Sequence, residues 1–245
     1  MANRALYLSL FGWVVAGCSS SPPLEQSASF NLPNVVNGRL AVGGVSAASG
    51  PIAESARQSY SSLLRRALVE QREDYPVLPA EEVQERLGVM YGPIERELQN
   101  KGELGEVSLA VLRKELADSR YIAFVRIDNN EVVRDRSETA DKDSSGTVIE
   151  GSRKVIATAN RNITASLTIY DLRLGEVAWR GTVSKKLGSS KQYDKEHEYT
   201  LTSVLNALQG KAAAVLDRKY PYPQAPGTEQ VLTKVFEGFG ERLPH

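Results

Sequence analysis

The chain has 245 residues, of which 41% are apolar and 24% are charged, and its 30 basic and 30 acidic residues give no net charge. This length fits one folded domain with short extensions, and the composition excludes a wholly disordered chain. A chain without net positive charge is a poor non-specific binder of nucleic acid, because such binding depends on neutralising phosphates. Two His and one Cys exclude a zinc site built from several Cys and His, an iron–sulfur cluster and an internal disulfide. We therefore expect no metal and no cofactor.

The N-terminus is typical of an export signal. Residues 1–4 carry one positive charge, and residues 5–15 are largely apolar. This apolar run is too short to cross about 30 Å of hydrocarbon, which needs about 20 helical residues. It suits the core of a signal peptide, and the small residues Ala16 and Gly17 suit the cleft of a signal peptidase.

The sequence Val15-Ala16-Gly17-Cys18 resembles the lipobox of bacterial lipoproteins. The resemblance implies cleavage between Gly17 and Cys18, a diacylglycerol on the Cys18 thiol, and an acyl chain such as palmitate on the new amine. Cys18 would then hold the protein on a lipid bilayer. Ser19 stands where an Asp tends to retain such proteins in the inner membrane, so it implies the periplasmic face of the outer membrane. The alternative is a buried free Cys that happens to follow an apolar stretch.

Four segments are expected along the chain. Residues 1–17 form the signal peptide, and residues 18–37 form the lipidated Cys with a flexible tether rich in Ser and Pro. Residues 38–219 form the periplasmic domain. Residues 220–245 contain a Pro/Tyr segment and a C-terminal helix.

In the first half of the domain, hydrophobic periodicity predicts helices separated by short strands. A first strand is expected over residues 39–45, and a short edge strand over residues 75–78, where Pro76 has no amide hydrogen to donate. The expected helices cover residues 52–73, a segment opening at Pro79, residues 94–100 and residues 108–117.

The second half is predicted to consist mainly of strands. Residues 121–127 are almost continuously apolar, which is typical of a central strand covered on both faces. Residues 162–169 and 176–183 alternate apolar and polar side chains, and residues 171–175 have the length and the Gly of a hairpin turn. Residues 128–152 are polar and charged, so we expect one weak strand over 131–135 and a mobile loop around 141–146.

Two amphipathic helices are predicted near the C-terminus, over residues 201–216 and 231–239, with a break at Tyr220-Pro221-Tyr222-Pro223. The order of elements predicts an α/β (α+β) fold, in which helices pack on a mixed β-sheet of about four to five strands. Trp179 is expected in the core between the sheet and the helices.

Two stretches resemble sequences shared by a group of periplasmic domains. They are residues 116–125, LADSRYIAFV, and residues 167–179, LTIYDLRLGEVAW. The group comprises the curli-secretion lipoprotein, the amino-terminal domain of TolB and the lipoproteins that activate penicillin-binding proteins. The resemblance covers roughly residues 38–217, although Leu174 stands where the group usually has Thr. It implies a protein that works by binding and assembly and is not an enzyme.

No catalytic residue is predicted. His197 has no second His at helical spacing, so a metal site is not expected there. The pairs Glu81/Glu82 and Glu95/Glu97 could serve as paired acids for glycosidic chemistry. Each pair lies on an amphipathic helix, however, where charges normally face water.

Tyr220 and Tyr222 are the candidate partner contact. Aromatic rings in a segment stiffened by prolines offer rigid contact area at low entropic cost. The alternative is that this segment straps the last helix to the domain.

The expected function is a non-enzymatic scaffold or accessory factor for an envelope assembly, secretion or wall-synthesis machine, with an unidentified envelope protein as partner and a homo-oligomer as an open possibility. One alternative is an oligomeric secretion-channel component of the curli-channel type. It needs two hairpins of about 9–11 alternating residues with an apolar lipid-facing side, which residues 128–159 are not expected to supply. A second alternative is a peptidoglycan-acting or peptidoglycan-binding protein.

Overall fold

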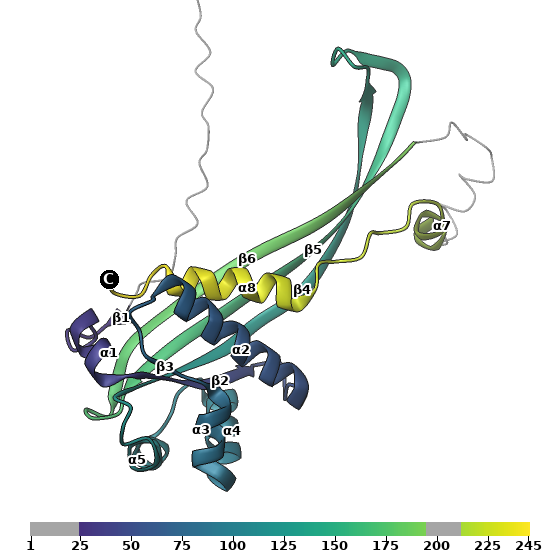
Figure 1. Ribbon diagram of the computed structural model, residues 1–245. Coiled ribbons are helices and arrows are strands. Elements are labelled where there is room, and N and C mark those ends of the chain that lie inside the picture. The colour runs from purple at the N-terminus through teal and green to yellow at the C-terminus, as the bar shows by residue number, and fades with distance from the viewer. Residues whose placement is uncertain (1–24, 195–211) are drawn as a thin grey trace, which may run out of the picture.

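The computed structural model describes residues 25–194 and 212–245 (Figure 1). Its centre is a six-stranded sheet in the order β1-β6-β5-β4-β2-β3. The strands are β1 (Glu25–Gln26), β2 (Leu40–Ala47), β3 (Val77–Leu78), β4 (Tyr121–Lys142), β5 (Val148–Asp171) and β6 (Glu176–Asp194). β2 runs parallel to β3 and β4, and the remaining pairs are antiparallel. The sheet is therefore mixed, as the sequence predicts.

Helices cover both faces of the sheet at its broad end, which we call the body. On one face lie α2 (Glu54–Gln71) and α8 (Thr228–Gly240), which contact each other (Figure 1). On the other lie α3 (Ala80–Leu87), a 3-10 turn η1 (Gly88–Met90), α4 (Tyr91–Lys101) and α5 (Glu106–Glu115). Two further helices are α1 (Leu32–Gly38) and α7 (Ala212–Lys219). The prediction of helices packed on a mixed sheet is confirmed.

Side chains of β4 alternate between two apolar cores, one on each face. Tyr121, Ala123 and Val125 face the α2/α8 side, while Ile122 and Phe124 face the α3/α4/α5 side. This explains why residues 121–127 are apolar except for Arg126, because both faces of a covered central strand must be apolar. Trp179 is fully buried in the α2/α8 core, edge-to-face with Phe239 at 6.4 Å between ring centroids. Its predicted place in the core is confirmed.

Beyond the body the sheet narrows to three strands, here called the β-arm: residues 128–142 of β4, 148–164 of β5 and 184–194 of β6 (Figure 1). β2 leaves the sheet where Ala47 pairs with Ile127, whereas β4 and β5 stay paired as far as Lys142 and Val148. Fifteen residues of β4 at about 3.3 Å each give the arm a length of about 50 Å.

The β-arm replaces the weak strand and mobile loop expected between residues 128 and 152. The chain there forms continuous strand closed by a tight turn, in which the Asp143 amide donates to the Thr147 carbonyl at 2.9 Å. The polar composition had suggested a loop because neither face shows an apolar alternation. β4 and β5 nevertheless stay paired through this region, because their apolar ends in the body already fix which residues face each other.

Residues 25–38, assigned from sequence to the tether, lie against the sheet. β1 pairs with Trp179 and Arg180 of β6, and the rings of Phe30 and Tyr121 meet edge-to-face at 5.1 Å. Phe30 and Val35 are fully buried. β1 also raises the strand number above the four to five expected. The expected helix over 201–216 falls largely outside the described residues.

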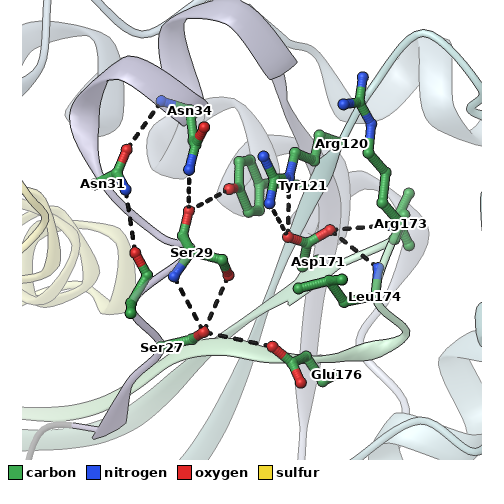
Figure 2. A network of polar contacts seen from close by, with 12 residues as sticks. Ser27, Ser29, Asn31, Asn34, Arg120, Tyr121, Asp171, Arg173, Leu174 and Glu176 are labelled. Atoms are coloured by element: carbon green, nitrogen blue, oxygen red, sulfur yellow. Dashed lines mark hydrogen bonds and ion pairs between the residues drawn. The ribbon is translucent and has the colours of Figure 1, made fainter.

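A polar network fixes this segment to the sheet (Figure 2). The Tyr121 hydroxyl donates to the carbonyl oxygen of Ser29 at 2.7 Å, and the Asn34 side-chain amide donates to the same oxygen at 2.8 Å. The Ser27 hydroxyl accepts from the Ser29 amide at 3.3 Å and donates to the Glu176 carboxylate at 3.4 Å. Ser and Asn side chains thus hold backbone groups that a flexible linker would leave to water.

Asp171 closes the β5–β6 hairpin in the same region (Figure 2). Its carboxylate is fully buried, and Oδ2 accepts from Nε and Nη2 of Arg120 at 2.9 and 2.8 Å. Oδ1 accepts from the backbone amides of Arg173 and Leu174 at 3.0 and 3.3 Å. The turn ends at Gly175, whose φ of 75° favours glycine. The predicted hairpin turn over residues 171–175 is confirmed.

Replacing Asp171 by Ala should lower the free energy of unfolding by about 3 kcal/mol, because the buried Arg120 guanidinium loses its counter-charge. The measurement is urea unfolding of a lipid-free form that begins at Ser19. The control is Asp118→Ala, which removes exposed ion pairs to Arg39 and Arg86 and should cost under about 1 kcal/mol. Equal losses in the two variants would contradict this account of the hairpin.

Candidate functional site: the β-arm

The β-arm has two different faces because of a β-bulge at its root. The register shifts between Ile127 and Asn129, so Asp128 has no partner on β5. A bulge of one residue inverts the direction of every side chain that follows on its strand. After it, the even-numbered residues of β4 share a face with Ala157, Ala159 and the other odd-numbered residues of β5.

One face, which continues the α2/α8 side of the sheet and is here called the covered face, is crossed by residues 220–227. We call this segment the strap. Arg136 of β4 holds its first part: the Arg136 Nε donates to the Tyr220 carbonyl at 2.9 Å, and Nη2 pairs with Asp217 at 2.6 Å. The same guanidinium lies 3.8 Å from the ring centroid of Tyr222. At this distance a cation–π interaction adds to the hydrogen bond.

The rest of the strap is held in the same way, by arm side chains that donate to strap carbonyls. The Tyr193 hydroxyl donates to Pro221, Ser189 Oγ to Gln224 and Arg161 Nε to Pro226, at 2.5, 2.5 and 2.7 Å. Prolines suit this arrangement, because they lack the amide hydrogen that would otherwise need an acceptor. The strap thereby connects the β-arm to α8 and the body.

Tyr220 and Tyr222, the partner contacts predicted from sequence, are thus brought onto the chain's own β-arm. Tyr220 is 6% exposed and packs on Tyr193 with ring centroids 5.7 Å apart. Tyr222 is half-buried beneath Arg136. The arrangement matches the strapping alternative, and a partner contact at these tyrosines stays a prediction. Nothing in the local sequence points to Arg136 or Arg161, which lie more than 60 residues earlier.

The opposite face of the β-arm, here called the open face, is built from small polar side chains. On β5 they form an unbroken column of alternate residues: Thr158, Asn160, Asn162, Thr164 and Ser166. Thr164 and Ser184 share a hydrogen bond of 2.9 Å between their hydroxyls. The helices α3, α4 and α5 lie at the body end of the sheet, away from the tip of the arm (Figure 1). The column therefore presents hydroxyl and amide groups in a row.

Asn162 of this face has one polar atom paired and one unpaired. Its side-chain amide donates to Glu131 at 3.1 Å, while its Oδ1 is buried and has no hydrogen-bond partner in the described residues. A buried acceptor without a donor carries a cost of about 1–3 kcal/mol. A ligand or partner that supplies a donor here would remove this cost.

The two outer strands of the β-arm have free edges. β2 stops at Ala47, opposite Ile127, and β1 pairs only with Trp179 and Arg180. Within residues 25–194 and 212–245, no strand pairs with the outer edge of β4 beyond that point or of β6 beyond Arg180. Unpaired edge groups are a template for strands of another chain, and charged side chains such as Glu131 and Asp135 limit indiscriminate pairing.

The arm does not resemble a membrane-spanning hairpin, although its strands are longer than the sequence predicts. The open face carries Glu131 and Asp135, and the covered face carries Arg134 and Arg136. A lipid-facing side must be apolar over about 9–11 residues of each strand. No helix among the described residues is long and apolar enough to cross a bilayer.

The acidic pairs considered in the sequence lie on helices, and three of their four carboxylates are engaged in ion pairs, while Glu81 accepts from Ser62. Glu95 pairs with Arg57, and Glu82 with Arg86. Hydrogen bonds from Ser108 and Lys101 lower the pKa of Glu97, so that carboxylate is ionised at neutral pH and is a poor general acid.

In the part of the chain that the structure describes, no three His, Cys, Asp or Glu residues gather as metal ligands. Cys18, Gly17 and His197 lie outside that part.

Comparison with known proteins finds likeness in structure only. No family model and no curated protein matches the sequence. The lipoprotein GNA1162 from Neisseria meningitidis is 13% identical with a TM-score of 0.38, and the match covers 74% of this chain and 99% of that one. The PelC dodecamer from Paraburkholderia phytofirmans is 10% identical with a TM-score of 0.38, covering 91% and 99% of the two chains. The LpoB C-terminal domain from Salmonella enterica is 9% identical with a TM-score of 0.34, covering 64% and 96%.

A double-mutant cycle between Arg136 and Tyr222 tests how the strap is held. Arg136→Ala, Tyr222→Ala and the double variant should give a coupling energy of about 1 kcal/mol in urea unfolding, because the guanidinium is largely buried over the ring. The matched control is Arg134→Ala with Tyr222→Ala, which should show no coupling, because Arg134 is exposed on the same strand. Similar coupling in both cycles would show that the arginine acts only through general stability.

Proposed function

We propose that this chain is a non-enzymatic lipoprotein of the bacterial envelope. Acyl chains on Cys18 anchor it to the periplasmic face of the outer membrane, and its β-arm is the docking element for an envelope assembly, secretion or wall-synthesis machine. The observation that carries the proposal is the placement of the two ends of the molecule. The sequence that resembles a lipobox ends six residues before β1, and an arm about 50 Å long leaves the opposite side of the body.

The anchor follows from the chemistry of acyl chains. Each buried methylene contributes about 0.8 kcal/mol, and one chain alone holds only weakly. Two or three chains on Cys18 give a stable anchor without a membrane-spanning helix.

The short connection keeps the body close to the lipid. Six residues separate Cys18 from Glu25, and a fully extended chain covers at most about 3.6 Å in each of the seven steps between them, so β1 lies within about 25 Å of the anchor. β1 pairs with Arg180 of β6. Arg180 pairs with Thr168 of β5, and Thr168 pairs with Phe124 of β4, so β1 lies level with Phe124. From Phe124 to Lys142 the strand covers about 60 Å. The arm can therefore meet a partner at a distance from the membrane that the body cannot reach.

The arm has the properties of a docking element. It combines free strand edges with an open polar face, and the strap ties it to the body. A β-strand of a partner can add to such an edge through main-chain hydrogen bonds, and side chains on alternate positions then provide specificity. The proposal assigns no catalytic residue and no cofactor.

The test uses the full lipidated chain in its bacterial host, with a photo-activatable amino acid at Thr158 on the open face. Irradiation should give a defined cross-linked adduct in the membrane fraction, and the same amino acid at Gln58 on α2 should give none. Cys18→Ser should move the protein out of the membrane fraction. Two results would contradict the proposal: membrane attachment that survives Cys18→Ser, or equal adducts from the arm and α2.

A further inference from the structure

A cavity of about 260 Å³ lies at the root of the β-arm, between the sheet and the C-terminal end of α4. It holds the volume of about nine water molecules, which is smaller than the site of a drug-sized ligand. β4 supplies Arg126 and Asp128 to its wall, β6 supplies Arg180, and the end of α4 supplies Lys101 and Glu103. Three of these five side chains are cationic and two are anionic, so the charged lining is net positive.

Sheet register places the two arginines on either side of β5. Arg126 pairs with Ser166 and Arg180 pairs with Thr168. Because Ser166 and Thr168 are two residues apart, all four side chains point to the same face. The guanidinium groups therefore flank a floor of two hydroxyls that also line the cavity.

The guanidinium of Arg126 is incompletely satisfied within the chain. Its Nε is buried and has no hydrogen-bond partner in the described residues, and it lies 3.6 Å from Asp128. The contacts of Arg180 with Glu103 and Glu25 are 3.6 and 4.0 Å. All three distances exceed the usual 2.7–3.2 Å of an N–H···O hydrogen bond. These donors can accordingly turn to a better acceptor without breaking a short internal bond.

Part of the remaining wall is apolar. Leu98 of α4 and Phe124 of β4 face the same cavity. A ligand that fits both the charged and the apolar wall carries an anionic group and a small apolar group. Arginine is the side chain best suited to the anionic group, because its planar donors match two oxygens of a carboxylate or phosphate.

We propose that this cavity binds a small organic anion, with its carboxylate or phosphate group held by Arg126 and Arg180 and its apolar part against Leu98 and Phe124. The site adjoins the open face at its body end, where Ser166 lines the cavity, and it does not depend on lipidation of Cys18. Its position beside Asp128, where the bulge begins the arm, places the ligand at the junction of arm and body.

The experiment follows backbone amide signals of the lipid-free chain by NMR during titration with inorganic phosphate, phenyl phosphate and benzoate. Saturable shifts should appear at residues 101–103 and 166–168, and phenyl phosphate should bind more tightly than phosphate because of its ring. Binding of the two phosphates but not of benzoate would identify the anionic group of the ligand as a phosphate. Binding of benzoate but not of the phosphates would identify it as a carboxylate. Benzyl alcohol, which lacks the charge, should not bind.

Variants separate the site from general charge. Arg126→Gln should weaken binding at least about tenfold, because a charge-assisted hydrogen bond is lost. Arg126→Lys keeps the charge without the planar donors and should restore part of the affinity. Arg134→Gln removes an exposed arm charge outside the cavity and should bind as the parent does. No saturable shift with any of the three anions, or equal affinity in Arg126→Gln and Arg134→Gln, would overturn the proposal.

Discussion

The buried carboxylate of Asp171 is the constraint on which the sheet depends. It neutralises Arg120, which immediately precedes β4, and accepts the turn amides between β5 and β6, so it joins three strands at one end of the sheet. A strand that slips by one residue reverses all its side chains, and the apolar core above Asp171 does not tolerate this. From there the pairing of β4 with β5 continues to Val148, with register shifts at Asp128 and between Ala140 and Lys142.

Much of the body could be predicted from the sequence because its elements bury apolar side chains at regular spacing. The strand at residues 121–127, the alternation around Ile163 and Leu167 and the apolar stripe of α8 all follow from this. The β-arm could not, since charged side chains stand on both of its faces: those of the open face meet water, and Arg136 and Arg161 of the covered face are held by the strap. The bulge at Asp128 adds to the difficulty, because it changes which residues of β4 face the core side.

The candidate site shows the same limit. Tyr220 and Tyr222 were recognisable as a rigid aromatic segment, but their contacts depend on Arg136 and on long-range pairing that local sequence does not encode. The cavity brings together Arg126 and Arg180 from different strands, and only the aligned register of β4, β5 and β6 shows that they are neighbours. By contrast, the anchor at Cys18 is proposed from a local motif, which depends on no long-range pairing.

The central structural claim is that residues 128–164 and 184–194 form a stiff three-stranded arm and not a loop. Double electron–electron resonance between nitroxides at Ser145, in the turn, and Ser184, at the root, tests it directly in a Cys18→Ser form, which has no other cysteine. Ser184 pairs with Thr164, 16 residues from Val148, so the account predicts one narrow distance distribution centred near about 50 Å. A broad distribution weighted to shorter distances would contradict it.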